Sequence, residues 1–140
     1  MNKPLIIIGN GGHASVLAEV LLVQGENILG FTAPAKEENS FGLVYLGTDE
    51  VINDYSNDEI ELVMGIGMLG PNSFREKLFR RFKEQGYAFK TVIHSSTIIA
   101  SSVKLAEGVQ VMAGAIIQTG TTIADNTIIN TGAIIDHDGC

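Results

Sequence analysis

The hydrophobic pattern of residues 93–140 repeats every six residues. In each of the eight successive sixes, the first position is aliphatic and the fifth is small or β-branched. A fixed short period is typical of stacked solenoids, and a period of six is typical of the hexapeptide parallel β-helix. An α-helix would instead repeat its apolar positions with a period of about 3.6 residues. The aliphatic positions are Ile93, Ile99, Leu105, Val111, Ile117, Ile123, Ile129 and Ile135.

Each six can supply one short strand and one corner of a three-sided prism, with three sixes to a coil. Because side chains alternate along a strand, we expect the aliphatic residue to point inward and the next residue to point outward. Successive coils should stack through parallel ladder hydrogen bonds. So thin a prism buries few side chains, and we therefore expect it to dock against the rest of the chain and against other subunits.

Residues 1–92 have a different pattern, in which β-branched apolar runs alternate with helix-like segments. This alternation predicts a small doubly wound α/β domain with a parallel sheet. We expect residues 1–92 to form this domain and residues 93–140 to form the β-helix, with no flexible linker between them. Strands are expected at residues 4–8, 27–32, 60–64 and 87–92, helices at 14–24, 48–55 and 73–85, and an edge element at 41–47.

The helix expected at residues 73–85 has one apolar side and one basic side. We interpret the basic side as a solvated face, which is the common role of such a run of charges. Its members are Arg75, Lys77, Arg80, Arg81 and Lys83.

The net charge of the chain limits which macromolecules are plausible binding partners. The chain of 140 residues has 16 Asp and Glu against nine Lys and Arg, a net charge of −7. Nucleic acid and anionic membrane are therefore poor candidates for a partner. No apolar run approaches the roughly 20 residues of a membrane span, and the apolar start is interpreted as a buried strand, not a signal peptide. A single cysteine gives no disulfide framework, so we expect a cytoplasmic protein.

Two glycine loops follow expected strands. Gly9-x-Gly11-x-x-Ala14 has the spacing that lets backbone N–H groups approach a phosphate at a helix N-terminus. Gly65-Ile66-Gly67 ends another strand of the same sheet, where open α/β sheets bind ligands. Either loop alone is equally well explained as a tight turn, but together they favour a phosphate-bearing ligand. The candidate binding residues are Gly9, Asn10, Gly11, Gly12, His13, Gly65, Ile66 and Gly67.

The phosphate-bearing ligand is not expected to be NAD. A dinucleotide site needs an acidic residue at the end of the second strand to hold the ribose hydroxyls. That strand ends in Phe31-Thr32-Ala33, and the next acids, Glu37 and Glu38, lie in a loop. A diphosphate remains compatible with the loops.

The segment Asp136-His137-Asp138 is the one place suited to acid–base chemistry, because a flanking carboxylate can orient an imidazole and support its protonated form. From spacing alone, a solvated histidine in a polar turn is the favoured interpretation. His13 is expected either to donate to a ligand phosphate or to cap its helix, and His94 to be structural. No second His or Cys has metal-ligand spacing, so we expect no metal site.

Four segments together carry a family resemblance: residues 6–13, residues 65–67 with Arg75, residues 92–96, and above all residues 129–138. The last contains Asn130-Thr131 and Asp136-His137-Asp138 in the spacing N-T-x-x-x-[IV]-[DE]-H-[DE]. The whole chain resembles the NeuD/PglD-like family of sialic-acid O-acetyltransferases and nucleotide-sugar N-acetyltransferases, which are left-handed β-helix acyltransferases. This resemblance overrides the interpretation of His137 as a solvated residue.

The resemblance implies a function for each domain. The N-terminal domain would hold a nucleotide-linked amino sugar, with the glycine loop and His13 near its phosphates. The β-helix would form a homotrimer with an acetyl-CoA cleft between subunits. His137 would be the general base, Asp138 would orient it, and Asn130 would line the cleft.

The leading function implied is transfer of acetyl from acetyl-CoA to the amino group of a dTDP- or UDP-linked 4-amino-4,6-dideoxy sugar. O-acetylation of a sialic-acid-like sugar, and nucleotide-sugar binding without catalysis, remain the alternatives.

The chain departs from the family near residue 140. Family members continue with several more coils, which carry a second histidine and backbone that binds coenzyme A, whereas this sequence stops within its third coil. Gly139 also stands where many relatives continue directly to Cys. We therefore expect these 140 residues to bind the nucleotide sugar and to acetylate it poorly.

Overall fold

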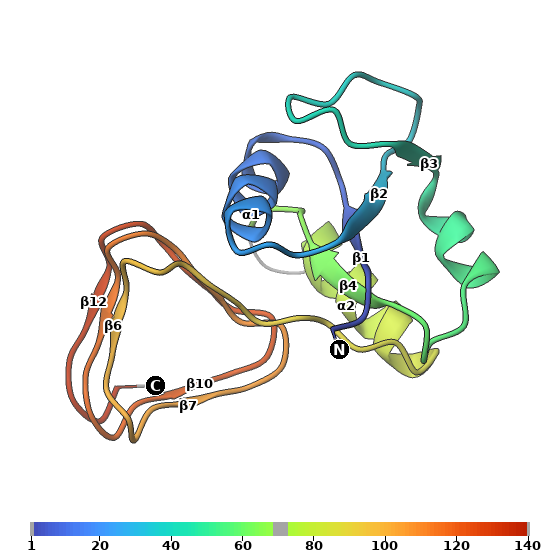
Figure 1. Cartoon of the computed structure of the whole chain (residues 1–140). Helices are drawn as coiled ribbons and strands as arrows, with labels where there is room; N and C mark the ends of the chain where they lie inside the picture. The colour runs from blue at the N-terminus through green and yellow to red at the C-terminus, as the bar shows by residue number, and fades with distance from the viewer. Residues whose placement is uncertain (1, 69–72, 140) are drawn as a thin grey trace. The chain divides into compact units, whose positions relative to one another are not determined.

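A parallel sheet is the framework of the first part of the chain in the computed structural model, which describes residues 2–68 and 73–139 (Figure 1). The strand order β3-β2-β1-β4 places β1 between two parallel neighbours. Its four residues are buried, as expected for a central parallel strand covered on both faces. The strands are β1 (Leu5–Ile8), β2 (Ile28–Thr32), β3 (Tyr45–Gly47) and β4 (Glu61–Met64).

Two helices cover the opposite faces of this sheet. Leu78 of α2 (Phe74–Glu84) packs in one cluster with Ile6 and Ile8. The side chain of Ile7 points the other way, where its Cγ2 and the Cβ of Ala14 in α1 (Gly12–Val23) border the same small space beside Gly65. A 3-10 helix, η1 (Asp49–Asp54), follows β3.

The start of α2 shows why its sequence forms a helix at that point. Ser73 is the N-cap, and its Oγ accepts a hydrogen bond of 3.2 Å from the backbone N–H of Glu76. Ser at the cap and Glu three residues later form the sequence pattern of a capping box.

Two sequence expectations differ from the observed elements. The helix expected at residues 48–55 is the 3-10 helix η1. The strand expected at residues 87–92 is reduced to a single bridge between Leu62 and Phe89, followed by the separate strand β5 (Val92–Ile93). Tyr87 is instead fixed by its side chain, whose hydroxyl donates to the carbonyls of Ile52 and Tyr55. An aromatic anchor of this kind leaves no strand periodicity in the sequence.

The chain divides into two units, Met1–Phe89 and Lys90–Cys140, called the N-terminal unit and the coil unit below. In the coil unit, two-residue strands wind around three sides of a prism (Figure 1). They form three parallel sheets, β5-β8-β11, β6-β9-β12 and β7-β10. The remaining strands are β6 (Ile98–Ile99), β7 (Lys104–Leu105), β8 (Gln110–Val111), β9 (Ile116–Ile117), β10 (Thr122–Ile123), β11 (Ile128–Ile129) and β12 (Ile134–Ile135).

The register of these sheets follows the six-residue repeat. Ile98 pairs with Ile116 and Ile116 with Ile134, so the neighbour of each strand lies eighteen residues along the chain, or three sixes. The region is therefore β-helix-like, with parallel strands stacked once per coil.

The interior of the coil unit is filled by the aliphatic residues that the repeat predicts to point inward. Ile93, in the first strand of the coil unit, is the exception and is 37% exposed. The interior cluster contains Val109, Val111, Ala115, Ile117, Ile123 and Ile129, with Ile99, Val103, Leu105, Ala133 and Ile135 packed against it.

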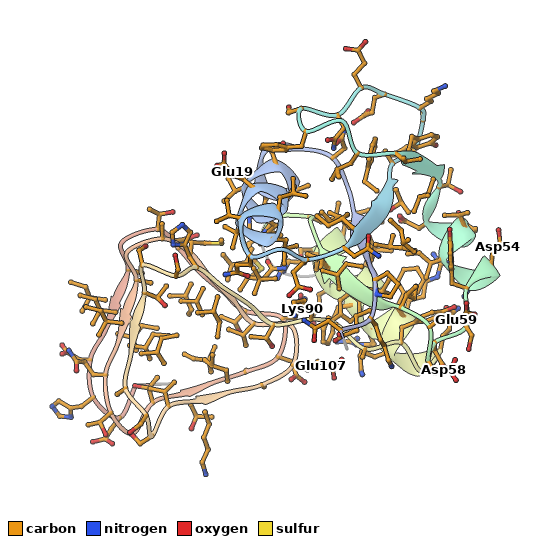
Figure 2. The ribbon with its side chains drawn as sticks, viewed as in Figure 1. Glu19, Asp54, Asp58, Glu59, Lys90 and Glu107 are labelled. Carbon is orange, nitrogen blue, oxygen red and sulfur yellow. The ribbon has the colours of Figure 1, made fainter. Side chains whose placement is uncertain are left out.

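Most of the acidic surplus lies in the N-terminal unit. Glu19, Asp54, Asp58 and Glu59 are all exposed, and Figure 2 shows their side chains projecting away from the ribbon.

We predict that Leu17→Ala destabilises the chain by about 2–5 kcal/mol, because it empties space in a packed core. Leu17 of α1 is buried, whereas Leu22 on the same helix is exposed. Leu22→Ala, the matched control, should cost less than about 1 kcal/mol. Urea unfolding followed by circular dichroism measures both, and equal losses for the two variants would contradict the packing of α1 described above.

Candidate functional site

The two glycine loops meet at the carboxyl ends of β1 and β4. Gly9 has φ +99°, and a Cβ there would lie 2.8 Å from Cδ1 of Ile66. Gly65 is as crowded, since a Cβ would lie 2.5 Å from the carbonyl oxygen of Ile8. The strand order changes direction between β1 and β4, which is where open α/β sheets bind ligands. The structure thus brings together Gly9, Gly65 and Ile66.

The rest of the first loop leads into α1. A Cβ at Gly11 or Gly12 would meet nothing within 4 Å, and Gly67 lies beside His13, with 3.8 Å between its ideal Cβ and that of His13. The N-cap of α1 is Gly11, which has no side chain to occupy the first-turn N–H groups. Helix N-termini with uncapped N–H groups are suited to phosphate.

The side chain of Asn10 forms hydrogen bonds within the protein. Its Nδ2 donates to Oε1 of Glu37 at 2.8 Å and to the carbonyl of Glu38 at 2.9 Å, and its Oδ1 accepts from Nδ2 of Asn39 at 2.8 Å. The amide therefore fastens the loop after β2 to the glycine loop. The Asn10 side chain is therefore engaged within the protein.

Arg75 supports the second glycine loop. Its buried position corrects the interpretation that the basic side of α2 is fully solvated. The side chain is 0% exposed, and its Nη1 donates to the carbonyls of Met64 at 3.2 Å and Ile66 at 2.6 Å. Burial lowers the pKa of Arg75 to about 10, so the guanidinium remains charged at neutral pH. The first turn of α2 lies against the carboxyl end of β4, which turns Arg75 inward.

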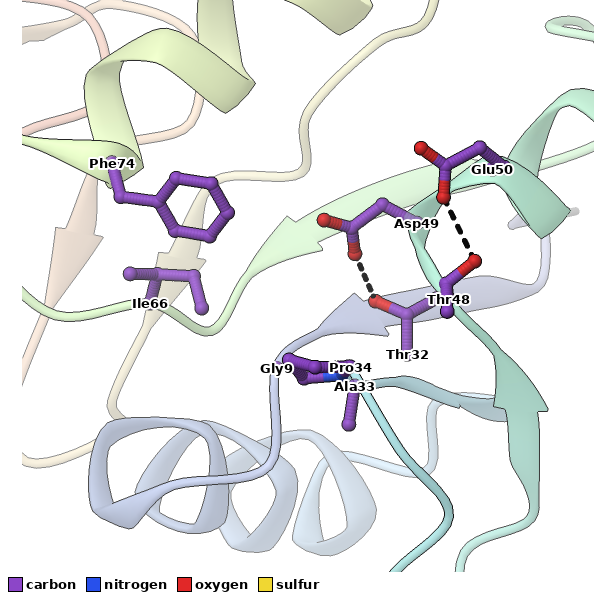
Figure 3. Close-up of a pocket in the computed structure, with 9 residues that line it drawn as sticks. All are labelled: Gly9, Thr32, Ala33, Pro34, Thr48, Asp49, Glu50, Ile66 and Phe74. Atoms are coloured by element: carbon purple, nitrogen blue, oxygen red, sulfur yellow. Dashed lines mark hydrogen bonds between the residues drawn. The ribbon is translucent and has the colours of Figure 1, made fainter.

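A cavity of about 240 Å³ opens beside the two loops (Figure 3). On one side, Thr32 Oγ1 donates to Oδ1 of Asp49 at 2.7 Å, and Thr48 Oγ1 donates to Oε2 of Glu50 at 2.8 Å. The hydrogen bond from Thr48 and the nearby Arg81 lower the pKa of Glu50. The lining residues are Gly9, Thr32, Ala33, Pro34, Thr48, Asp49, Glu50, Ile66 and Phe74.

In the coil unit, His137 lies in the turn that follows β12. Its side chain is 74% exposed, and Nδ1 is 3.3 Å from Oδ2 of Asp138. The backbone N–H of Asp138 donates to the carbonyl of Thr119 at 2.9 Å, which ties this turn to the preceding coil. The arrangement leaves Nε2 of the imidazole on the side away from the carboxylate, where it can act on a ligand.

The other two polar candidates of the coil unit, Asn130 and His94, follow strands of the sheet β5-β8-β11 and lie at a different corner from His137. Asn130 lies in the turn after β11, so β12 separates it from His137 within one chain. His94 Nδ1 accepts the backbone N–H of Ser96 at 3.0 Å, which gives His94 a structural role in its turn. Within residues 2–68 and 73–139, no cluster of His, Cys, Asp or Glu could hold a metal ion, and no helix is long and apolar enough to span a membrane.

Comparison with known proteins identifies the family. The family model of the PglD N-terminal domain matches residues 4–82, more than half of the chain. The chain belongs to the PglD family. This result confirms the NeuD/PglD-like resemblance, and the matched range includes residues 6–13, residues 65–67 and Arg75. No curated protein matches the sequence.

This PglD-family chain is similar to solved structures along nearly its whole length, so the similarity includes the coil unit. The acetyltransferase domain of PglB from Neisseria gonorrhoeae FA1090, in complex with acetyl coenzyme A, is 28% identical over 99% of the chain, with a TM-score of 0.88. PerB from Caulobacter crescentus, in complex with CoA and GDP-perosamine, is 37% identical over 97% of the chain, with a TM-score of 0.83. The chain spans 66% of the first protein and 64% of the second.

Three residues of this PglD-family site could not be assigned a role from the sequence. Arg75 was recognised only through the family resemblance, because a buried arginine and a solvated one have the same helical spacing. Asp49 and Glu50 lie on the 3-10 helix, 17 residues or more after the end of β2. The only sequence signal in that segment was the Thr-Asp-Glu pattern at residues 48–50. It predicts a helix cap and gives no indication that these residues line a cavity.

We predict that Arg75→Met lowers the free energy of unfolding by about 2–5 kcal/mol, because the buried carbonyl of Met64 and the part-buried carbonyl of Ile66 lose a donor. Arg80 is the matched control, since its side chain is 69% exposed and forms an ion pair of 2.7 Å with Glu76. Arg80→Met should cost at most about 1 kcal/mol. Denaturant unfolding compares them, and a loss at Arg75 no larger than at Arg80 would show that the guanidinium does not support the loop.

Proposed function

We propose that the chain transfers acetyl from acetyl-CoA to the amino group of a nucleotide-linked amino sugar. The observation that carries this proposal is the similarity over almost the whole chain to the Caulobacter protein with bound CoA and GDP-perosamine. A related structure from the same organism is described as a perosamine N-acetyltransferase in which one histidine is replaced with asparagine.

The N-terminal unit supplies the nucleotide-sugar site. Gly9 lies against the side chain of Ile66, and both residues line the cavity at the switch point of the sheet. The uncapped N-terminus of α1 offers N–H groups and the positive end of the helix dipole to a diphosphate. We assign the phosphates to residues 9–13 and the adjoining nucleoside to the cavity beside them.

The coil unit, which we take to be a left-handed β-helix, supplies the acid–base chemistry. His137 Nε2 removes a proton from the sugar amine as its nitrogen attacks the thioester carbonyl. A carbon–nitrogen bond forms, the tetrahedral oxyanion collapses, and the carbon–sulfur bond breaks to release the coenzyme A thiolate. Asp138 at Nδ1 holds the ring in the tautomer with a free Nε2 lone pair and supports the imidazolium.

The acetyl-CoA cleft is proposed to lie between subunits of a homotrimer, with Asn130 along it. Ile98, Ile116 and Ile134 form a ladder on the outer face of the sheet β6-β9-β12. Ile98 is 64% exposed and Ile134 is 68% exposed, and an apolar ladder of this kind is stabilised when a partner covers it. His137 follows Ile134 by three residues, so a subunit that covers the ladder lies next to the imidazole.

The reaction is assigned to the cytoplasm. A chain with one cysteine has no internal disulfide, which suits a reducing compartment.

We predict that His137→Ala reduces acetyl transfer by about 10²–10⁴-fold, the usual contribution of a general base. The test incubates the chain with acetyl-CoA and a panel of GDP-, UDP- and dTDP-linked 4-amino sugars and free sialic acids, and follows thiol release and product mass. His94→Ala is the matched control and should retain activity, because its imidazole caps a different turn. Transfer only to sialic-acid hydroxyls, or equal activity of wild type and His137→Ala, would contradict the proposal.

We predict that Ile134→Glu converts a trimer into monomers, because each interface would bury an unpaired carboxylate. Lys104 occupies the same outward position in β7, and Lys104→Glu should leave the assembly intact. Sedimentation velocity distinguishes these results. A monomeric wild-type chain, or a trimer that survives Ile134→Glu, would rule out the isoleucine ladder as the interface.

A further inference from the structure

The end of β2 carries a carboxylate that the local sequence does not supply. Nucleotide-binding doubly wound folds place Asp or Glu there, on the ribose hydroxyls. In this chain the strand ends at Thr32, whose buried hydroxyl donates to Oδ1 of Asp49 at 2.7 Å. Asp49 begins η1, so a later element delivers the acid to this position. Asp49, which is distant in the sequence, therefore occupies the place of the ribose-binding acid that β2 itself lacks.

The carboxylate of Asp49 faces the cavity. Figure 3 shows its second oxygen pointing away from Thr32 and toward the side of the cavity formed by Ile66 and Phe74. Phe74 is exposed, so its ring is accessible to a flat ligand group. The cavity thus has an acceptor on one wall and an apolar surface on the other.

Glu50, the second acid on the same wall, is engaged elsewhere. It accepts the hydroxyl of Thr48 and lies 3.6 Å from the guanidinium of Arg81. Asp49 is bonded only through Oδ1 in the described part of the chain, which leaves Oδ2 as the acceptor available to a ligand.

The chemistry of this wall selects the nucleoside, not the diphosphate. A carboxylate accepts hydrogen bonds and repels phosphate, so its ligand must present donors. Ribose presents adjacent 2′- and 3′-hydroxyl donors next to a flat base that suits the wall of Ile66 and Phe74. The first glycine loop, which suits the diphosphate, borders the same cavity at Gly9.

We propose that Asp49 accepts a hydrogen bond from the ribose 2′-hydroxyl of the nucleotide sugar, held in place by Thr32. This assignment rests on the proposed nucleotide-sugar function and narrows it. The chain selects ribonucleotide donors, such as UDP- or GDP-linked sugars, over the 2′-deoxyribonucleotide dTDP-linked sugars that the sequence left equally open.

The test measures binding of UDP against 2′-deoxy-UDP, and of GDP against 2′-deoxy-GDP, to the full chain by isothermal titration calorimetry. Each pair shares its base and phosphates, so the ratio of the two affinities isolates the 2′-hydroxyl. Wild type should bind the ribose form about 10–100-fold more tightly, the usual effect of a hydrogen bond to a charged group. Asp49→Ala should bring the ratio close to one, and Thr32→Val should give an intermediate ratio.

Asp54→Asn removes one negative charge from an exposed position of the same 3-10 helix, outside the cavity lining, and should leave the ribose-to-deoxyribose ratio at its wild-type value. Because each ratio is taken within one variant, partial loss of folded protein does not alter it. Equal binding of both sugar forms by wild type, or a preserved ratio in Asp49→Ala, would overturn the role of Asp49 while leaving nucleotide binding intact. Failure of the folded chain to bind any of these four nucleotides or dTDP would overturn the proposed function and this assignment together.

Discussion

The coil unit depends on the pairing of very short strands. A strand of two residues has too few hydrogen bonds to persist alone, so each is held by a parallel neighbour one coil away. Ile98, Ile116 and Ile134 occupy equivalent positions for this reason, and every coil must have the same length. Each side of the prism contributes aliphatic side chains to the interior, such as Ile117 and Ile123. The turn that carries His137 is thereby fixed at a corner of the prism.

The N-terminal unit depends on a different constraint, which is the close approach of the two glycine loops at one end of its sheet. Gly9 and Gly65 have no room for side chains, so the two loops lie in close contact, and Gly9 lines the cavity beside them. Polar side chains hold the two loops in place. Asn10 fastens one loop to residues 37–39, and Arg75 fastens the other to α2. Rigid support of this kind keeps a binding surface in shape before the ligand arrives.

The coil is well predicted from the sequence, because each six-residue repeat adopts the same local geometry and so carries the same pattern of aliphatic and small residues. The parallel sheet, the two glycine loops and the turn around His137 are also predictable, since each depends on residues that are close in the chain. The role of Arg75 was not predictable, because burial depends on where α2 lies on the sheet. The same holds for Asp49, whose partner Thr32 is 17 residues away, and for residues 87–92, which an aromatic anchor holds in place of a strand.

The central claim is that the N-terminal unit binds a nucleotide sugar whose amine reacts at His137 of a coil. A crystal structure of the chain with coenzyme A and a nucleotide-linked amino sugar tests it most directly. The account predicts the nucleoside in the cavity between Asp49 and Phe74, and the sugar amine within hydrogen-bonding distance of a His137 imidazole. A nucleoside bound away from the ends of β1 and β4, or an amine and thioester remote from every His137, would contradict it.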